Sequence, residues 1–173
     1  MIRPACEADL DMISSIYERI HDNEEAGLSS TGWIRGVYPV RATAEASLLK
    51  HELYVLCLNG NIVAAARINH EQEPSYDACS WLFPASTDQV LVLHTLVVDP
   101  KEARRGLGKA FVHYYEAMAR QLGCTALRLD TNERNTAARH LYPSLGYREA
   151  GIVPCDFHGI PGIRLVLFEK RIS

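Results

Sequence analysis

The feature of this chain that most constrains its fold is a long apolar segment that runs directly into a basic, glycine-containing turn. Residues Val90–Val98 are almost entirely apolar, and Asp99-Pro100 ends the segment. The KEARRGLGK sequence that follows places Gly106 and Gly108 where a helix is predicted to begin. Glycines let a backbone approach a phosphate closely, and the first turn of a helix carries unpaired N–H donors at its positive end. The sequence therefore predicts an anion-binding turn between a strand and a helix.

Two common phosphate-binding motifs do not fit this turn. Phe111 stands where the dinucleotide fingerprint has its third glycine. Ala103 and Ala110 replace the first glycine and the Ser/Thr of the Walker A pattern. The mobile charges at the turn are Arg104, Arg105 and Lys109. Taken alone, such a run of charge would be interpreted as a solvated surface.

A more extended pattern favours ligand binding. The turn fits Gln/Arg-x-x-Gly-x-Gly/Ala, the acyl-CoA turn of the GNAT-type N-acetyltransferases. Downstream, NTAARHLYPSLGY (135–147) resembles the family element Asn-x-x-Ala…Leu-Tyr-x-x-Leu-Gly-Phe/Tyr, with room for one helix and one strand between the two motifs. Two positions depart from the family: Ala103 replaces the usual Gln/Arg, and Pro143 follows the family tyrosine, where a proline removes one helical hydrogen bond. The motifs span roughly the C-terminal half of the chain, and the N-terminal half resembles the family in its order of elements.

Composition bounds the class of protein. The chain has 173 residues, 47% of them hydrophobic, which is enough for one domain (1–173) with its own core. A net charge of −3 argues against a nucleic-acid binder, and no segment is long and apolar enough to span a membrane. Five scattered cysteines without a C-x-x-C pair, and an N-terminus with acids in its apolar run, predict a cytoplasmic protein with reduced thiols and no metal.

Hydrophobic periodicity predicts the element order β-α-α-β-β-β-α-β-α-β-β, which is mixed α/β and neither doubly wound nor a barrel. The resemblance implies a single GNAT-like domain. Its central sheet would have six to seven mostly antiparallel strands, splayed at the fourth and fifth, with helices on both faces. The predicted strands are Met1–Arg3, Leu53–Leu58, Ile62–Ile68, Val90–Val98, Ala126–Asp130, Tyr147–Val153 and Ile163–Lys170, and the predicted helices are Glu7–His21, Ala44–Lys50, Gly106–Leu122 and Thr136–Leu145.

The resemblance also implies acetyl-CoA as the cofactor. The main chain of Leu96, Val97 and Val98 would bind the pantetheine arm as an added strand does, while their side chains pack in the core. Asn135 would be a helix cap, a CoA contact or both. The diphosphate would lie on the turn formed by Arg104, Arg105, Gly106, Leu107, Gly108 and Lys109.

Two residues are candidates for proton transfer. By its match to the family tyrosine, Tyr142 would donate a proton to the CoA sulfur; the alternative is an aromatic side chain packed beside Leu141 and Leu145. His94 would relay the proton of the acceptor ammonium, since histidine titrates in the useful range. Its Leu-His-x-Leu-x-Val context is similar to that of arylalkylamine-type members, and the alternative is a core or edge histidine bonded to a carbonyl.

These features predict an N-acetyltransferase that acts on a primary amine of a small molecule or peptide by direct attack in a ternary complex. A non-catalytic acyl-CoA-binding or sensor module on the same fold is the alternative. A nucleotide-binding protein is a third reading, but no Mg²⁺-holding motif accompanies the turn. Trp33 and Tyr38 lie where the family builds its acceptor lid, although they could equally anchor a small core. A homodimer is a further possibility, because dimers are common in the family. Specificity is expected from 22–38, 69–89 and 156–162.

Overall fold

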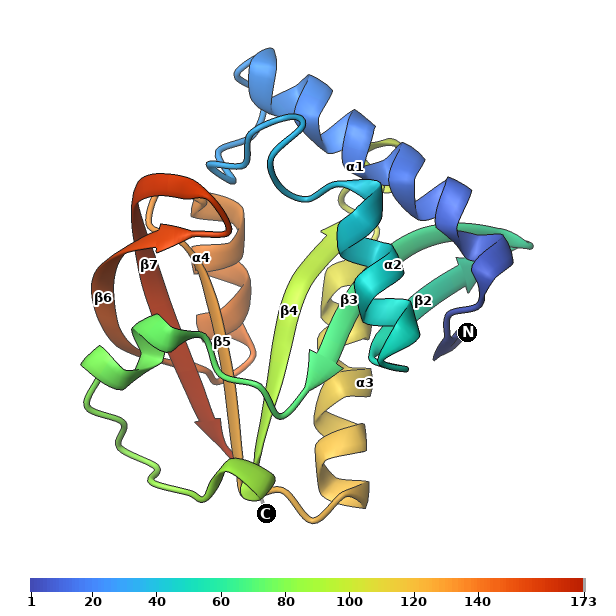
Figure 1. Cartoon of the computed structure of the whole chain (residues 1–173). Coiled ribbons are helices and arrows are strands. Elements are labelled where there is room, and N and C mark those ends of the chain that lie inside the picture. The colour runs from blue at the N-terminus through green and yellow to red at the C-terminus, as the bar shows by residue number, and fades with distance from the viewer. Residues whose placement is uncertain (173) are drawn as a thin grey trace.

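The computed structural model describes residues 1–172 and is built around one seven-stranded sheet, ordered β1-β2-β3-β4-β5-β7-β6 (Figure 1). Every neighbouring pair is antiparallel except β4 and β5, which are parallel. The predicted mostly antiparallel sheet is therefore confirmed, with seven strands. The strands are β1 (Ile2–Pro4), β2 (Leu53–Leu58), β3 (Asn61–Asn69), β4 (Val90–Val98), β5 (Ala126–Asn132), β6 (Arg148–Phe157) and β7 (Ile160–Arg171).

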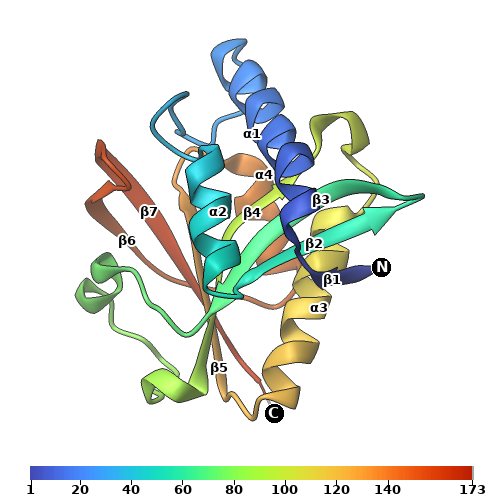
Figure 2. The ribbon, with the colours of Figure 1, turned by 45° about the vertical axis from the view of Figure 1, so that its right-hand side comes forward.

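Four helices cover the two faces of this sheet. Helices α1 (Leu10–Glu25) and α2 (Arg41–Leu49) lie on one face, and α3 (Leu107–Gln121) and α4 (Thr136–Ser144) lie on the other (Figures 1 and 2). The amphipathic spacing of apolar residues explains why these segments pack as they do. In α1 the buried apolar side chains recur at helical intervals, as Leu10, Ile13, Ile16, Tyr17 and Ile20.

The parallel pair at the centre is fixed from behind by α3. Phe111 and Tyr115 of this helix are fully buried against the sheet. The Tyr115 hydroxyl donates to the carbonyl of Leu91 in β4 (2.6 Å) and contacts that of Arg128 in β5 (3.1 Å). A single side chain thus bridges both strands just before they diverge, which fixes the starting point of the functional site.

The helix boundaries near the N-terminus differ from the prediction. The helix predicted over Glu7–His21 begins at Leu10 and extends to Glu25, with a 3-10 turn at Glu7–Asp9 before it. Asp9 explains the later start, because its carboxylate accepts from Arg3 and from the Cys6 N–H. The helix predicted over Ala44–Lys50 begins three residues earlier, at Arg41.

The last two strands are longer than predicted. The segment 156–162 was expected to be a turn-rich loop, but strands occupy most of it and only His158-Gly159 forms the turn. Both turn residues have positive φ (+48° and +85°), as a tight two-residue hairpin turn requires. Pro161 is tolerated in β7 because pairing with β5 starts only at Leu165.

Candidate active site

The parallel pair β4–β5 is hydrogen-bonded over only the first part of each strand. Val90–Leu93 pair with Ala126–Leu129, and beyond these residues the strands diverge (Figure 1). The splay predicted between the fourth and fifth strands is therefore confirmed. On its other edge β4 carries a bulge, because Thr95 and Leu96 together lie opposite one residue of β3, and Thr95 has φ +50°. From His94 onward, β4 presents an edge toward β5 that no strand covers.

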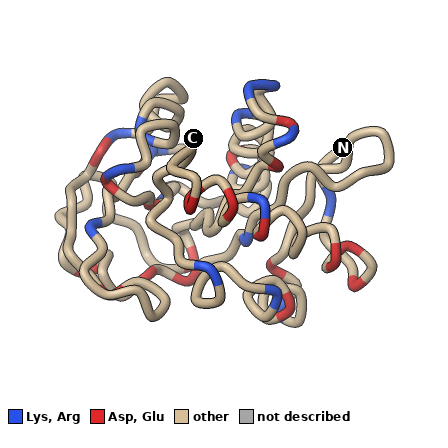
Figure 3. The backbone as a smooth tube through the Cα atoms, turned by 90° about the horizontal axis from the view of Figure 1, so that it is seen from above, with Lys and Arg blue, Asp and Glu red and all other residues tan. Residues whose placement is uncertain are grey.

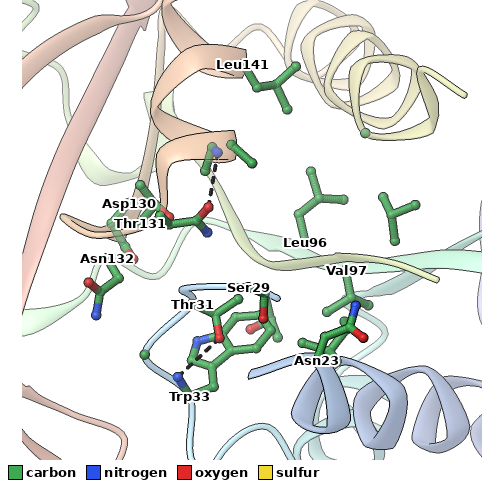
Figure 4. A pocket seen from close by; sticks show the side chains of 18 of the residues that line it. Asn23, Ser29, Thr31, Trp33, Leu96, Val97, Asp130, Thr131, Asn132 and Leu141 are labelled. Atoms are coloured by element: carbon green, nitrogen blue, oxygen red, sulfur yellow. Dashed lines mark hydrogen bonds between the residues drawn. The ribbon is translucent and has the colours of Figure 1, made fainter. Parts of the chain in front are cut away.

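A cavity of about 400 Å³ opens where the strands diverge. Leu96, Val97 and Val98 of β4 form one wall, and the end of β5 together with α4 forms another. Figure 4 shows Leu141 above and Trp33 below Leu96, so apolar side chains line the cavity from both sides. An extended, largely apolar ligand with amide groups would find an uncovered strand edge along this cavity.

The basic turn lies at the α3 end of this cavity. Arg104 (φ +64°) and Gly106 (φ +73°) both have left-handed backbone conformations. The first hydrogen bond of α3 joins the Ala110 N–H to the Gly106 carbonyl (2.9 Å). The N–H groups of Leu107–Lys109 consequently have no acceptor within the helix and are available to an anion.

Two small residues of this region line the cavity, Ala103 and Gly108. A Cβ added to Gly108 would lie 3.6 Å from Leu141 Cδ2 and 3.8 Å from Val98 Cγ2. Gly108 therefore stands between the two walls, where it lets the helix N-terminus approach a ligand closely. The alanine that departs from the family pattern occupies a lining position with a side chain too small to obstruct it.

The cationic side chains of the turn are directed to solvent. Arg104, Arg105 and Lys109 are all exposed, and Arg105 forms an ion pair with Glu102. Of the predicted diphosphate-binding residues, Gly108 lines the cavity, and the others lie in the turn and first helical residues next to it. That they bind CoA stays a prediction.

Tyr142 lies at the inner end of the cavity. It is 6% exposed, lines the cavity, and packs its ring 5.4 Å from that of Phe168 and 5.9 Å from that of Tyr147. Burial raises the pKa of the Tyr142 phenol above its ordinary value of 10, with the nearby Asp130 charge acting in the same direction. The phenol therefore stays protonated at neutral pH and can act as a proton donor.

Helix α4 positions Tyr142 in spite of the proline that follows it. Asn135 caps the helix, since its Oδ1 accepts from the Ala138 N–H (3.1 Å). At the other end, the Tyr142 carbonyl accepts from the N–H groups of Leu145 (3.0 Å) and Tyr147 (3.1 Å). Pro143 thus stands in a last turn that is closed by other main-chain bonds, and the Tyr142 side chain faces the cavity. Asn135 lines the same cavity, so its cap and ligand roles are compatible.

Asp130 is a functional candidate that sequence reasoning missed. It lies on β5 just after the pairing with β4 ends, lines the cavity and accepts a hydrogen bond from the Tyr76 hydroxyl on Oδ2 (2.7 Å). Burial raises its pKa to about 6, although the bond from Tyr76 acts in the opposite direction. A carboxylate with this pKa is ionised at neutral pH and is a stronger base than an ordinary aspartate. In the sequence, Asp130 only ends the predicted strand 126–130, which also contains the charged residue Arg128, so an acid at this position gives no distinct signal.

His94 does not line this cavity. Its Nε2 lies 2.9 Å from Asn69 Oδ1 and 3.0 Å from the Glu71 carbonyl, which are both acceptors, so Nε2 carries a proton. Its Nδ1 lies 3.6 Å from Glu73 Oε1 and faces a second cavity of about 500 Å³. The alternative of a buried histidine bonded to a carbonyl is correct for Nε2, while Nδ1 remains the atom able to accept a proton. Its role as a base stays a prediction.

The two predicted lid aromatics lie between these spaces. Trp33 lines the first cavity, and Tyr38 and Thr95 line both. The Tyr38 hydroxyl forms a short hydrogen bond with Thr95 Oγ1, and its ring stacks on His158 at 4.2 Å between centroids. The predicted acceptor segments 22–38, 69–89 and 156–162 therefore meet here. Their role in acceptor binding stays a prediction.

The remaining charges define what the site can hold. Acidic and basic residues are interspersed over the molecule (Figure 3). Within residues 1–172, no group of three or more metal-ligating side chains is found, and no helix there is long and apolar enough to cross a membrane. The helix N-terminus and the uncovered strand edge beside the first cavity suit an anionic ligand with an amide-containing arm, which is the chemistry of an acyl-CoA.

Comparison with known proteins agrees with this chemistry. The model of the acetyltransferase (GNAT) family matches residues 14–147, more than half of the chain. The chain therefore belongs to the GNAT family of acetyltransferases, which use acetyl-CoA as acyl donor.

Individual relatives are more distant. Over 60 residues, the chain is 38% identical to the [ribosomal protein bS18]-alanine N-acetyltransferase of Escherichia coli K12, a match that spans 35% of this chain and 40% of that relative. A GNAT-family acetyltransferase of Streptococcus agalactiae 2603 has a TM-score of 0.82 at 26% identity, covering 100% of this chain and 95% of that one. The fold of yncA from Salmonella typhimurium, solved with its cofactor acetyl-CoA, has a TM-score of 0.70 at 18% identity, covering 100% and 94%.

Proposed function

We propose that this protein transfers an acetyl group from acetyl-CoA to a primary amine of a small molecule or peptide, by direct attack in a ternary complex. One observation carries the proposal: two cavities share Thr95 and Tyr38 as lining residues, and one lies beside the helix N-terminus while the other lies beside His94. A donor in the first and an acceptor in the second would be neighbours without an intermediate carrier.

The first cavity divides the binding of acetyl-CoA between main chain and side chains. The N–H groups of Leu107–Lys109 would bind the diphosphate, with Arg104 and Arg105 adding long-range charge. The uncovered edge at Leu96–Val98 would bind the amides of the pantetheine arm. When bound, acetyl-CoA supplies an activated acyl group as a thioester. A main-chain N–H near Val97–Val98 would stabilise the negative charge that develops on the acyl oxygen.

Two proton transfers accompany the reaction. An alkylammonium with a pKa of about 10.4 must lose a proton before it attacks. Asp130, whose pKa is raised to about 6, and His94 through Nδ1 are the acceptors near the junction of the cavities. Tyr142 would donate a proton to the leaving sulfur, so the charge on the sulfur is neutralised as the bond to the acyl carbon breaks.

Direct transfer is favoured over a covalent acyl-enzyme. None of the cysteines in residues 1–172 lines either cavity, so no thiol is placed to take the acyl group first. The segment match to an alanine N-acetyltransferase supports an amine as acceptor, but it spans less than half of that relative.

The test is to measure acetyl-CoA binding by calorimetry and CoA release with a panel of amino acids, polyamines, arylalkylamines, aminoglycosides and peptides. We expect binding that free CoA competes away, and acetylated product from at least one class of amine. Binding without any product would support a sensor module instead. No binding at millimolar acetyl-CoA would contradict the proposal at its first step.

A further inference from the structure

The second cavity, beside His94, carries a charge arrangement that points to one class of acceptor. We propose that it binds a free α-amino acid with an apolar side chain, holding the ammonium at Glu73 and His94 and the carboxylate at Arg67 and Lys50. This inference rests on the proposed acetyl transfer and identifies its acceptor.

The part of the cavity that would bind the ammonium contains one carboxylate between two imidazole rings. Glu73 Oε1 lies 3.6 Å from His94 Nδ1 and 3.5 Å from His158 Nε2. Burial opposes ionisation of Glu73, but the two histidines outweigh it and lower its pKa to about 2. The carboxylate is thus ionised at any pH at which the protein would work, and it is only 17% exposed.

His94 gives the second observation. The residue is 8% exposed, and its Nε2–H is already committed to Asn69 and the Glu71 carbonyl. Its Nδ1 lies beside the Glu73 carboxylate, so the two side chains line the cavity together. The ionised carboxylate supplies acceptor oxygens for a ligand with several N–H donors on one atom, and an ammonium is such a group.

The carboxylate end lies directly across the strand pair. Arg67 of β3 is the register partner of His94 of β4. Side chains of directly opposed residues share a face of the sheet, with Cβ atoms roughly 5 Å apart. Positive and negative binding groups are therefore close neighbours, as an α-amino acid requires, because one carbon carries both its charged groups.

Arg67 and Lys50 retain capacity for a ligand. Arg67 donates through Nε to Glu52 (2.7 Å) and through Nη2 to Glu71, whereas within residues 1–172 its Nη1 has no hydrogen-bond partner. Lys50 donates to Glu71 (2.9 Å), and both of these side chains are more than half exposed. A substrate carboxylate can share these cations with Glu71 at little cost, since exposed ion pairs contribute little to stability.

The α2 side of the cavity is formed by small residues and ends at Lys50, one turn beyond Ala46. Thr43 and Ser47 also line it, with their hydroxyls bonded to main-chain groups of the same segment. Ala42 and Ala46 stand four residues apart on the same face of α2, and Val37 and Val40 continue the surface. This wall leaves room for an apolar side chain and offers no partner for a long cationic one. A polyamine would also meet Arg67 and Lys50, which repel its second ammonium.

A peptide N-terminus satisfies these groups less well. It presents an ammonium to Glu73, but its first carbonyl belongs to a neutral amide. Arg67 and Lys50 then lose the charge-assisted hydrogen bonds that a free carboxylate accepts. The cavity thus discriminates free amino acids from peptides by charge at one position.

The experiment compares three forms of one acceptor: leucine, leucinamide and 3-methylbutylamine, each with saturating acetyl-CoA. We expect kcat/KM for leucine to exceed that for leucinamide by about tenfold or more, because a hydrogen bond to a charged group is lost in the amide. Arg67→Gln should reduce this preference to near one. Arg41→Gln is the matched control, since Arg41 is on the same helix as Ala42 but binds Asp11 and Glu45 outside the cavity.

Arg67 also binds Glu52, so its loss could disturb the fold. Lys50→Gln, at an exposed position, provides the second variant and should lower the preference several-fold without this risk. Saturation-transfer NMR of leucine against leucinamide measures the same preference without turnover. Turnover of peptides or leucinamide at least as fast as leucine would overturn this inference and leave acetyl transfer standing. No acetylated product from any amine, despite binding of acetyl-CoA, would overturn both.

Discussion

The two cavities that share Thr95 as a lining residue differ in the groups that give them their polarity. The one beside α3 has apolar walls together with a helix N-terminus and an uncovered strand edge, whose main-chain groups can meet a ligand, and polar side chains such as Asp130 and Asn132 also line it. The one beside α2 is lined by Glu73, His94 and Arg67, whose side chains carry its polarity. A main-chain site depends on backbone conformation and tolerates many side chains. A side-chain site changes its ligand with a single substitution. The difference explains why a cofactor can be common to a family while the acceptor is not.

Tyr142→Phe tests the cofactor side and should have the largest effect. Loss of a general acid typically costs 10²–10⁴-fold, so kcat should fall by about 100-fold or more while acetyl-CoA still binds. The measurement is steady-state turnover together with calorimetry. Tyr147→Phe is the matched control, because within residues 1–172 its buried hydroxyl has no hydrogen-bond partner and its removal should leave turnover intact. Unchanged kcat in the Tyr142 variant would remove its role as acid.

Asp130→Asn tests the junction and should lower kcat by roughly 10- to 100-fold, less than Tyr142→Phe because His94 Nδ1 is a second proton acceptor nearby. In the wild type, the rate should fall as pH drops below about 6, where Asp130 becomes protonated. The variant should lose this acidic limb. Tyr76→Phe should move the limb to higher pH, because it deletes the bond that holds the Asp130 pKa down.

Asp130→Asn should also change the thermal stability of the protein in a pH-dependent way. The pKa of folded Asp130 lies above its ordinary value of 3.8, so folding favours the protonated form. The stability this contributes is present below about pH 4 and lost as pH rises through 6. Asp130→Asn should therefore raise Tm at pH 7.5 relative to the wild type and change it little at pH 4. An equal change in Tm at both values of pH would contradict the assigned shift.

Gly106→Ala sharpens the contrast between main-chain and side-chain sites. Alanine at φ +73° costs roughly 1–2 kcal/mol, and relief of this strain would move the N–H donors of the turn. We expect the Kd for acetyl-CoA to rise by about fivefold. Gly123→Ala is the control, because Gly123 follows the other end of α3 at φ +74° with the same open surroundings. It should lose similar stability with no change in Kd, and an equal rise in Kd would show that the turn itself is not the binding site.

The smallest effects are expected for the charges of the turn. Arg104→Gln, Arg105→Gln and Lys109→Gln should each raise the acetyl-CoA Kd only about two- to threefold, because these side chains are exposed and screened by salt. The effect should diminish further at high ionic strength. Arg120→Gln, in the last turn of α3, is the control. A loss of tenfold or more at any of these positions would mean that side chains, and not the main chain, dominate this site.

Much of the fold was predictable because its signals are local. The apolar run of β4, the Asn59-Gly60 hairpin and the glycines of the α3 turn each lie within a few consecutive residues. The prediction of a loop at 156–162 was wrong, and the reason is also local. Pro161 and Gly162 are typical of a loop, and only the pairing of β7 with its neighbours shows that they belong to a strand.

In the candidate site too, residues from contiguous motifs were predictable, and residues from distant segments were not. The residues expected to bind the cofactor come from contiguous motifs. Leu96–Val98, Gly108 and Asn135 line one cavity, and the other predicted residues lie in the turn beside Gly108. Glu73, His158 and Asp130 could not be found, because they come from three distant segments and no spacing links them. His94 was found as a candidate, but the cavity that it lines depends on contacts with Asn69, Glu71 and Glu73, which no sequence spacing shows.

The shared wall of Tyr38 and Thr95 has a consequence for how this protein can evolve. A change that reshapes either residue is expected to alter the affinities for donor and acceptor together, because both residues line both cavities. Substitutions that change the acceptor can therefore accumulate more readily at Ala46 or Lys50, which line only the second cavity, than at Tyr38 or Thr95, which line both.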